Sequence, residues 1–321
     1  MKAVKLGILG FGNIGKGTYE LLNLNRQKIQ RVTGREIYIE KILVRDVKRN
    51  RGIAGIEEYL TSNPEDIIKN PDIDIVVEVL SGEKPAADYI YQALENGKHV
   101  VTANKAALAA NFEKLTAKAE EAGRFLKFEA SVAGGIPVLN SLSTVLQANE
   151  YVQVKGIVNG TTNYILSQMT ENGARYDDVL KKAQALGFAE ADPTADVEGI
   201  DAANKLSILI SLMFEQYVAP GKIPTKGITG VTLKDIEDAK EKGCVIKLIT
   251  SAGLVNGKLA YGVKPELIHL SHPLAGVNNE FNAVYVEGNA VGELMFYGRG
   301  AGSLPTASAV MGDVMEICKT L

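Results

Sequence analysis

The stretch Val4–Gly15, VKLGILGFGNIG, decides how this chain folds. Its apolar start predicts a buried β-strand, a G-x-G-x-x-G sequence follows, and a helical pattern begins at Ile14. In this order, Gly10 lets the chain turn sharply, Gly12 lets a pyrophosphate approach the backbone, and Gly15 lets the helix pack closely on the strand. The stretch therefore predicts a dinucleotide site at the start of that helix.

Strands and helices alternate outward from this stretch to about residue 130. We expect strands at 36–44, 74–80, 98–102 and 124–129, and helices at 14–29, 84–96 and 111–122. This alternation predicts an α/β fold, a Rossmann-type parallel sheet with helices on both faces. Ligands of such sheets bind at the carboxyl ends of the strands, where Ser81 and Lys105 are expected.

A second pattern follows the α/β half. We expect helices at 138–146, 160–169, 176–186, 199–214 and 231–242, and strands at 151–158, 244–255, 258–269, 281–287 and 291–297. Asn256-Gly257 is a strong signal for a tight hairpin between two of these strands. The sequence therefore predicts a nucleotide-binding domain at 1–135 and an α+β substrate and dimerisation domain with an antiparallel sheet at 136–302. A last helix at 303–321 can pack back onto the first domain.

Composition excludes several classes of protein. A length of 321 residues favours two domains, and a net charge of −3 gives no general basic surface for nucleic acid or membrane. No apolar run reaches the ~18 residues of a membrane span. The early first strand leaves no room for a signal peptide. Two distant cysteines, Cys244 and Cys318, fit a reducing, cytoplasmic setting and predict no zinc cluster.

The residue after the second strand bears on the choice between NADP and NAD. Arg45 is the first charged residue there, and a guanidinium accommodates the 2′-phosphate of NADP. Basic residues at 48, 49 and 51 add to this preference, whereas Asp46 keeps NAD open. The alternative interpretation is a solvated basic loop.

Two lysines are candidates for chemistry. Lys205 lies four residues after Asp201, so both share one face of a helix that is otherwise apolar and therefore buried. The alternative is an exposed ion pair worth a few tenths of a kcal/mol. An acidic loop upstream, with Glu190 as its first carboxylate, favours a substrate that carries an ammonium group. Lys105 can transfer a proton or stabilise an alkoxide, or simply face solvent.

Six segments then carry a resemblance across nearly the whole chain: GFGNIG, VVTANKAALA, EASVAGGIP, NGTTNYIL, GFAEADPTADVEGIDAANK and GRGAGSLPTASAV. In this order and spacing they resemble homoserine dehydrogenase. The resemblance implies NADP- or NAD-dependent interconversion of L-homoserine and L-aspartate 4-semialdehyde, in the synthesis of threonine, methionine and isoleucine. Two alternatives stay open: a sensor that binds NAD(P) without chemistry, and a dehydrogenase for another amino acid or semialdehyde.

The resemblance also implies site residues. Lys205 would be the catalytic proton donor and acceptor, with Lys105 near the reacting oxygen. The substrate residues would be Glu190, Asp201, Gly160 and Thr161. The cofactor residues would be Gly10, Gly12, Asn13, Ile14, Gly15, Arg45, Ser81, Thr102, Lys105 and Gly302. A sodium ion would be held by Glu129, Val132, Gly134 and Ile136.

Two departures from the family pattern are visible. Many members carry a C-terminal ACT-type regulatory domain, whereas this sequence ends at Leu321, so we expect no feedback inhibition by threonine through such a domain. Members often have Gly-Gly after the third strand, where this chain has Ser81-Gly82. The family further implies a homodimer built through the sheet of the second domain.

Overall fold

The computed structural model describes residues 3–321, and the chain divides into two compact units. Unit 1 comprises the chain up to Gly135 together with Gly302–Leu321, and unit 2 comprises Ile136–Ala301. Each unit contains one β-sheet with its own helices.

The sheet of unit 1 has six parallel strands in the order β3-β2-β1-β4-β5-β6. The strands are β1 (Val4–Leu9), β2 (Ile37–Leu43), β3 (Leu60–Thr61), β4 (Ile75–Glu78), β5 (His99–Thr102) and β6 (Leu126–Lys127). The order reverses between β1 and β4, the point where open α/β sheets bind ligands. The predicted parallel α/β sheet is confirmed. The strand expected at 124–129 is only two residues long, and β3 was not predicted.

Helices cover both faces of this sheet. They are α1 (Asn13–Leu24), α2 (Arg26–Thr33), α3 (Glu65–Ile68), α4 (Ala86–Glu95), α5 (Lys105–Ala110), α6 (Phe112–Glu121) and α12 (Ser303–Thr320). One apolar core packs α1, α2 and α12 against one face of the sheet. A second core packs the four helices α3, α4, α5 and α6 against the other face. The single helix expected at 14–29 is wrong, because Asn25 has a non-helical conformation between α1 and α2.

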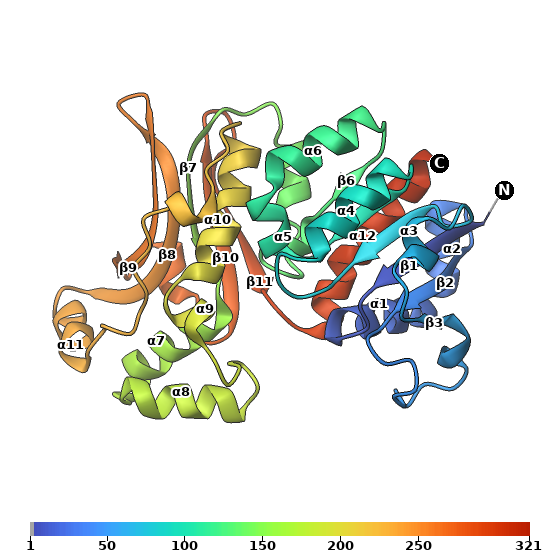
Figure 1. Ribbon diagram of the computed structural model, residues 1–321. Coiled ribbons are helices and arrows are strands. Elements are labelled where there is room, and N and C mark those ends of the chain that lie inside the picture. The colour runs from blue at the N-terminus through green and yellow to red at the C-terminus, as the bar shows by residue number, and fades with distance from the viewer. Residues whose placement is uncertain (1–2) are drawn as a thin grey trace. The chain divides into compact units, whose positions relative to one another are not determined.

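The last helix belongs to unit 1, although the chain of unit 2 precedes it. Figure 1 shows the red α12 beside the blue α1. The Ser303 hydroxyl donates to the carbonyl oxygen of Asn13 over 2.7 Å. Gly17 provides the space for this approach, because a Cβ on it would lie 2.5 Å from the Ser303 oxygen. The start of α12 therefore packs against the start of α1, although the two helices lie near opposite ends of the sequence.

The sheet of unit 2 has five antiparallel strands in the order β11-β10-β7-β8-β9. The strands are β7 (Tyr151–Ile157), β8 (Cys244–Val255), β9 (Lys258–His269), β10 (Phe281–Gly288) and β11 (Gly292–Arg299). Asn256 and Gly257 both have positive φ, as a tight hairpin turn with the strand twist requires. The antiparallel sheet and its hairpin are therefore as the sequence predicts.

The helices of unit 2 are α7 (Gly160–Asn172), α8 (Tyr176–Ala185), α9 (Thr194–Val197), α10 (Ile200–Met213) and α11 (Leu233–Glu241). A helix forms at residues 139–145, close to the one expected at 138–146, but Ser141–Val145 is π-helical. Helix α10 is buried along most of its length, as its apolar sequence predicts.

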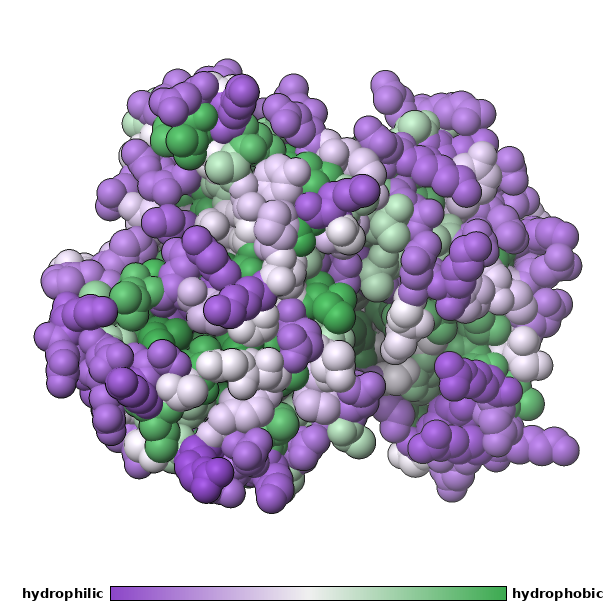
Figure 2. Space-filling view, turned by 60° about the vertical axis from the view of Figure 1, so that its left-hand side comes forward, coloured by the Kyte–Doolittle hydropathy of each residue, from purple (hydrophilic) through white to green (hydrophobic). Residues whose placement is uncertain are grey.

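Charged and polar side chains, purple in Figure 2, cover most of the visible face. Within residues 3–321, no helix is long and apolar enough to cross a membrane.

Candidate active site

The glycine-rich turn between β1 and α1 is shaped by close backbone contacts in unit 1. Gly10 has φ +108°, and a Cβ on it would lie 3.1 Å from the carbonyl oxygen of Val79, the residue after β4. Gly15 packs so tightly against the Gly10 carbonyl that a side chain has no room. Gly12 is exposed and borders open space. The turn therefore leaves the amino end of α1 accessible to an anion.

The corner after β2 is cationic. Arg45 is exposed, and the side chain of Asp46 accepts a hydrogen bond from the Lys48 backbone N–H over 2.9 Å. Arg51 donates to the Asp46 carbonyl oxygen over 2.6 Å, and Lys16 of α1 donates to the Arg51 carbonyl oxygen over 3.4 Å. The only carboxylate of the corner is thus engaged within its own loop, while several positive charges gather around it.

Three expected cofactor residues lie at the carboxyl edge of β4 and β5. Ser81 is exposed in the loop after β4, Thr102 is the buried last residue of β5, and Lys105 is the half-buried first residue of α5. Asn104 caps this helix, because its side-chain oxygen accepts from the Ala107 N–H over 3.1 Å. The cap fixes the start of α5, and with it the position of the Lys105 backbone.

The expected cation loop is buried. Glu129 is 6% exposed, Val132 and Gly134 are buried, and Ala133 and Gly134 have φ of 57° and 56°. The Glu129 N–H donates to Asp313 over 2.9 Å. No group of three His, Cys, Asp or Glu that could hold a metal occurs within residues 3–321. One carboxylate with backbone carbonyls needs no such group, and an oxygen-only donor set suits a hard cation.

Lys205 and Asp201 form a buried pair on α10 in unit 2. The Lys205 ammonium donates to the Asp201 carboxylate over 2.7 Å and to the carbonyl oxygen of Val158 over 2.6 Å. Asp201 and Lys205 are 6% and 8% exposed. The alternative of an exposed ion pair is therefore wrong, and the first turns of α10 hold a fixed, desolvated cation. Asp201 lies in the first turn, where the helix dipole favours its negative charge.

Asn159 connects this pair to the start of α7. Its side-chain oxygen caps the helix by accepting from the Thr162 N–H over 2.9 Å. Its amide nitrogen donates to Asp201 over 2.9 Å and to Asp196 over 2.7 Å. The polar turn opening α7 is visible in the sequence, but its bonds to two carboxylates 37 and 42 residues away are not.

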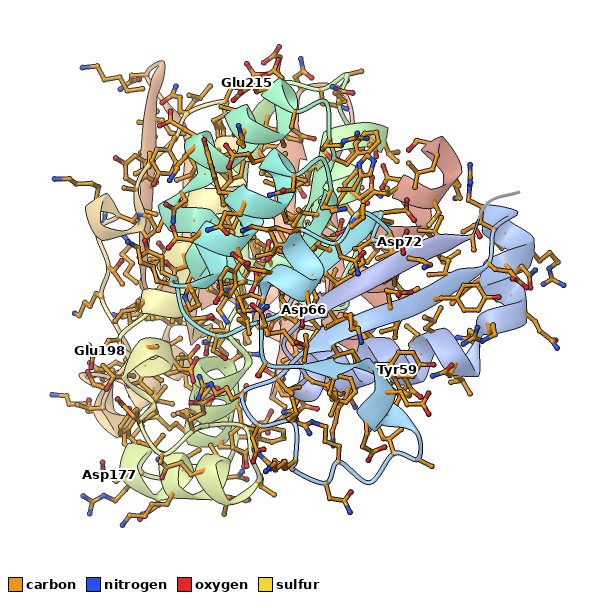
Figure 3. The ribbon with its side chains drawn as sticks, turned by 45° about the vertical axis from the view of Figure 1, so that its right-hand side comes forward. Tyr59, Asp66, Asp72, Asp177, Glu198 and Glu215 are labelled. Carbon is orange, nitrogen blue, oxygen red and sulfur yellow. The ribbon has the colours of Figure 1, made fainter. Side chains whose placement is uncertain are left out.

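The acidic loop is only partly drawn into this network. Thr161 donates to the carbonyl oxygen of Phe188 over 2.6 Å, which ties α7 to the segment that carries Glu190. Glu190 itself is exposed. Glu198, labelled in Figure 3, is also exposed at the end of α9. Asp196 alone of the loop carboxylates bonds to Asn159, so the loop does not gather around Lys205 as a whole.

Sequence reasoning missed Lys247, which lies on β8 and is 2% exposed. Its ammonium donates to the Val277 carbonyl oxygen over 2.6 Å and to the side chains of Asn278 and Asn163 over 2.9 and 3.2 Å. Burial lowers the pKa of Lys247 to about 8. A lysine within the apolar strand sequence CVIKLIT was the available signal.

This cluster supports the loop that packs on α7. Asn163 donates to the carbonyl oxygens of Val277 and Phe281. A Cβ on Gly160 would lie only 2.8 Å from the Glu280 carbonyl oxygen. The absence of a side chain at Gly160 thus lets this loop pack against the start of α7.

Two family models match the chain. One described as the NAD-binding domain of homoserine dehydrogenase matches residues 10–129, and one described as homoserine dehydrogenase matches residues 137–315. The homoserine dehydrogenase of Bacillus subtilis (strain 168) is 45% identical over 321 residues, which are 100% of this chain and 74% of that protein.

Solved structures agree with these matches. The crystal structure of a homoserine dehydrogenase from Thiobacillus denitrificans has a TM-score of 0.96 at 45% identity, covering 99% of this chain and 74% of that one. A hyperthermophilic archaeal homoserine dehydrogenase in complex with NADPH has a TM-score of 0.84 at 28% identity, covering 100% of this chain and 99% of that one.

Proposed function

This chain belongs to the homoserine dehydrogenase family, and from that premise we propose which of its residues carry out the reaction. It is an NAD(P)-dependent oxidoreductase of amino-acid biosynthesis that interconverts L-homoserine and L-aspartate 4-semialdehyde. A role as a dinucleotide sensor without chemistry is thereby excluded.

Lys205 is the proton donor and acceptor in this proposal, and its buried contact with Asp201 is the observation that carries it. During reduction, its ammonium donates a proton to the substrate oxygen as the aldehyde becomes an alcohol. During oxidation, the neutral amine takes the hydroxyl proton. The Asp201 carboxylate and the Val158 carbonyl hold the nitrogen in one position, which limits the reorganisation needed during proton transfer.

The substrate amino group is a cation, and Glu190 and Asp201 are proposed to bind it. Glu190 is exposed and lies two residues after Phe188, whose carbonyl oxygen accepts a hydrogen bond from Thr161. This bond holds the segment of Glu190 against the start of α7, where Gly160 lies. Asn159 and Lys205 both donate to Oδ2 of Asp201, which fixes the position of this carboxylate. These contacts favour an amino-acid substrate over a simple hydroxy acid.

NADP is the proposed cofactor, with NAD as the alternative; when bound, its nicotinamide supplies or accepts the hydride. The open amino end of α1 at Gly12, Asn13 and Ile14 would hold the pyrophosphate, between Gly10 and Gly15. Arg45 would hold the 2′-phosphate, since Asp46 is engaged in its own loop. Ser81, Thr102, Lys105 and Gly302 would line the rest of the cofactor site.

A sodium ion is proposed at the loop that contains Glu129, Val132, Gly134 and Ile136, where the donors would be one buried carboxylate and backbone carbonyls. We further propose a homodimer built through the sheet of unit 2, and a cytoplasmic location, which the pathway to threonine, methionine and isoleucine favours.

Turnover of Lys205→Ala tests the central assignment. Reduction of NADP or NAD by L-homoserine is followed by absorbance of the reduced nicotinamide. We expect a fall in kcat of about 10²–10⁴-fold with unchanged dinucleotide binding in calorimetry. Lys240→Ala, an exposed lysine on α11, is the matched control. Turnover of Lys205→Ala near that of the control would refute the role. Glu190→Ala should mainly raise KM for homoserine, and an unchanged KM would remove Glu190 from the amino-group site.

A further inference from the structure

Glu78 is a buried carboxylate that the proposed reaction does not use. It is the last residue of β4, next to β1 and β5 in the sheet, and it is 0% exposed. Burial raises the pKa of the Glu78 carboxyl to about 7, although its hydrogen bonds act in the opposite direction. A carboxylate in such a position is costly, so the groups that it holds indicate why it is there.

The two oxygens of Glu78 accept from three different segments. Oε1 accepts from the Leu80 backbone N–H over 2.7 Å and lies 3.4 Å from the Asn104 amide nitrogen. Oε2 accepts from the Thr102 hydroxyl over 2.6 Å. A carboxylate offers about four lone-pair positions without any donor, which matches a site where every neighbour donates.

Asn104 extends these contacts to the loop after β4 and to α5. Its amide nitrogen also donates to the Gly82 carbonyl oxygen over 2.8 Å. Its side-chain oxygen caps the helix that begins at Lys105, and its backbone N–H donates to the Thr102 hydroxyl over 3.0 Å. Glu78 and Asn104 together therefore link both ends of the loop 80–82 to the end of β5 and the start of α5.

The same edge reaches the glycine-rich turn. The Leu80 side chain and the Val79 carbonyl lie 3.0 and 3.1 Å from where a Cβ on Gly10 would be. Because Glu78 fixes the Leu80 backbone, it also fixes the surface against which this turn packs.

We propose that Glu78 is the positioning residue of the dinucleotide site, holding the loop of Ser81, the Thr102 hydroxyl and the start of α5 at Lys105 in one arrangement. This inference rests on the proposed cofactor roles of those three residues. Glu78 acts through its neighbours, because its carboxylate is completely buried behind them. Without it, the Leu80 N–H and the Asn104 amide would lose an acceptor inside the protein.

Three variants of the full chain test this inference. Glu78→Ala removes the acceptor. Glu78→Gln keeps the shape: its oxygen can accept from Leu80, while its amide can donate to the Thr102 hydroxyl, which rotates. Val76→Ala, two residues earlier on β4, removes buried apolar surface and is the control for destabilisation alone.

The first readout is amide hydrogen exchange, which needs no cofactor. In Glu78→Ala, the amides of Leu80 and Ala107 should exchange at least about tenfold faster than in Val76→Ala. Glu78→Gln should remain within about threefold of the wild-type protein. Equal exchange in Glu78→Ala and Val76→Ala would overturn the inference.

The second readout is the cofactor. Glu78→Ala should raise Kd and KM for NADP at least about tenfold and lower kcat, while KM for homoserine changes little. Glu78→Gln should recover most of this loss, and a Gln variant as impaired as the Ala variant would overturn the inference. If the wild-type protein bound neither NADP nor NAD, the proposed cofactor roles would fail, and amide exchange would still decide whether Glu78 organises the edge.

Discussion

Replacing the buried Lys247 with methionine should change how the stability of the protein depends on pH. Methionine fills a similar volume but carries no charge. In the native protein Lys247 is 2% exposed, and its ammonium donates to three acceptors, on Asn163, Val277 and Asn278. The substitution therefore removes a buried cation together with the hydrogen bonds that hold the loop between β9 and β10 against β8.

The magnitude follows from the pKa of the lysine. Burial lowers it from 10.5 to about 8, and this difference corresponds to about 3 kcal/mol. Between these two pH values, the unfolded chain binds more protons at this site than the folded chain. The free energy of unfolding of the wild-type protein should therefore rise with pH through this window, whereas Lys247→Met lacks this contribution. The wild-type advantage over the variant should grow by up to about 3 kcal/mol.

Urea denaturation followed by far-UV circular dichroism measures this difference, because the chain has no tryptophan for fluorescence. The wild-type protein, Lys247→Met and the control Lys258→Met should be compared at about pH 7.5, 8.5 and 9.5. Lys258 begins β9, next to β8, and is exposed, so its replacement measures the loss of a surface lysine on the same sheet.

Two results would refute this reasoning. A stability difference between the wild-type protein and Lys247→Met that stays constant with pH would show that burial of the cation costs little. A difference that shrinks as pH rises would have the wrong sign for a lysine whose pKa is lowered by burial.

Three further substitutions have defined outcomes. Arg45→Ser should raise KM for NADP about tenfold and leave KM for NAD nearly unchanged in initial-rate measurements, because it removes the expected contact with the 2′-phosphate; an equal change for both cofactors would contradict this. Gly15→Ala should lower stability by about 1–3 kcal/mol and weaken dinucleotide binding in calorimetry, since a methyl group collides with the Gly10 carbonyl; a wild-type melting curve would contradict this. Asn159→Ala should cost about 1–3 kcal/mol in urea denaturation and lower kcat, because α7 loses its cap and Asp201 loses a donor; unchanged kcat would separate Asn159 from the catalytic pair.

Local patterns in the sequence were sufficient for most of the fold. Alternation of apolar strands with helices predicts the parallel sheet of unit 1, and Asn256-Gly257 predicts the hairpin of unit 2. The requirement at Gly15 is also local, because a side chain there would collide with the Gly10 carbonyl, whereas a side chain at Gly10 would meet Val79 and Leu80 from a distant part of the chain. The i, i+4 spacing likewise placed Asp201 and Lys205 on one helix face.

Local patterns failed where the end of an element depends on its neighbours. The break at Asn25 interrupts a stretch that is periodic enough to predict one continuous helix, and Ser141–Val145 is π-helical within the helix expected at 138–146. Weak local preferences are overridden there by packing against the rest of the unit.

What the sequence by itself determined was the order and type of the elements, and which residues share a face. What only the tertiary structure decided was the set of partners of the buried polar groups. Glu78 meets Thr102 24 residues away, Lys247 meets Val277 30 residues away, and Lys205 meets the Val158 carbonyl 47 residues away. A buried charge persists only where such distant donors or acceptors converge on it, and periodicity along the chain carries no information about that convergence.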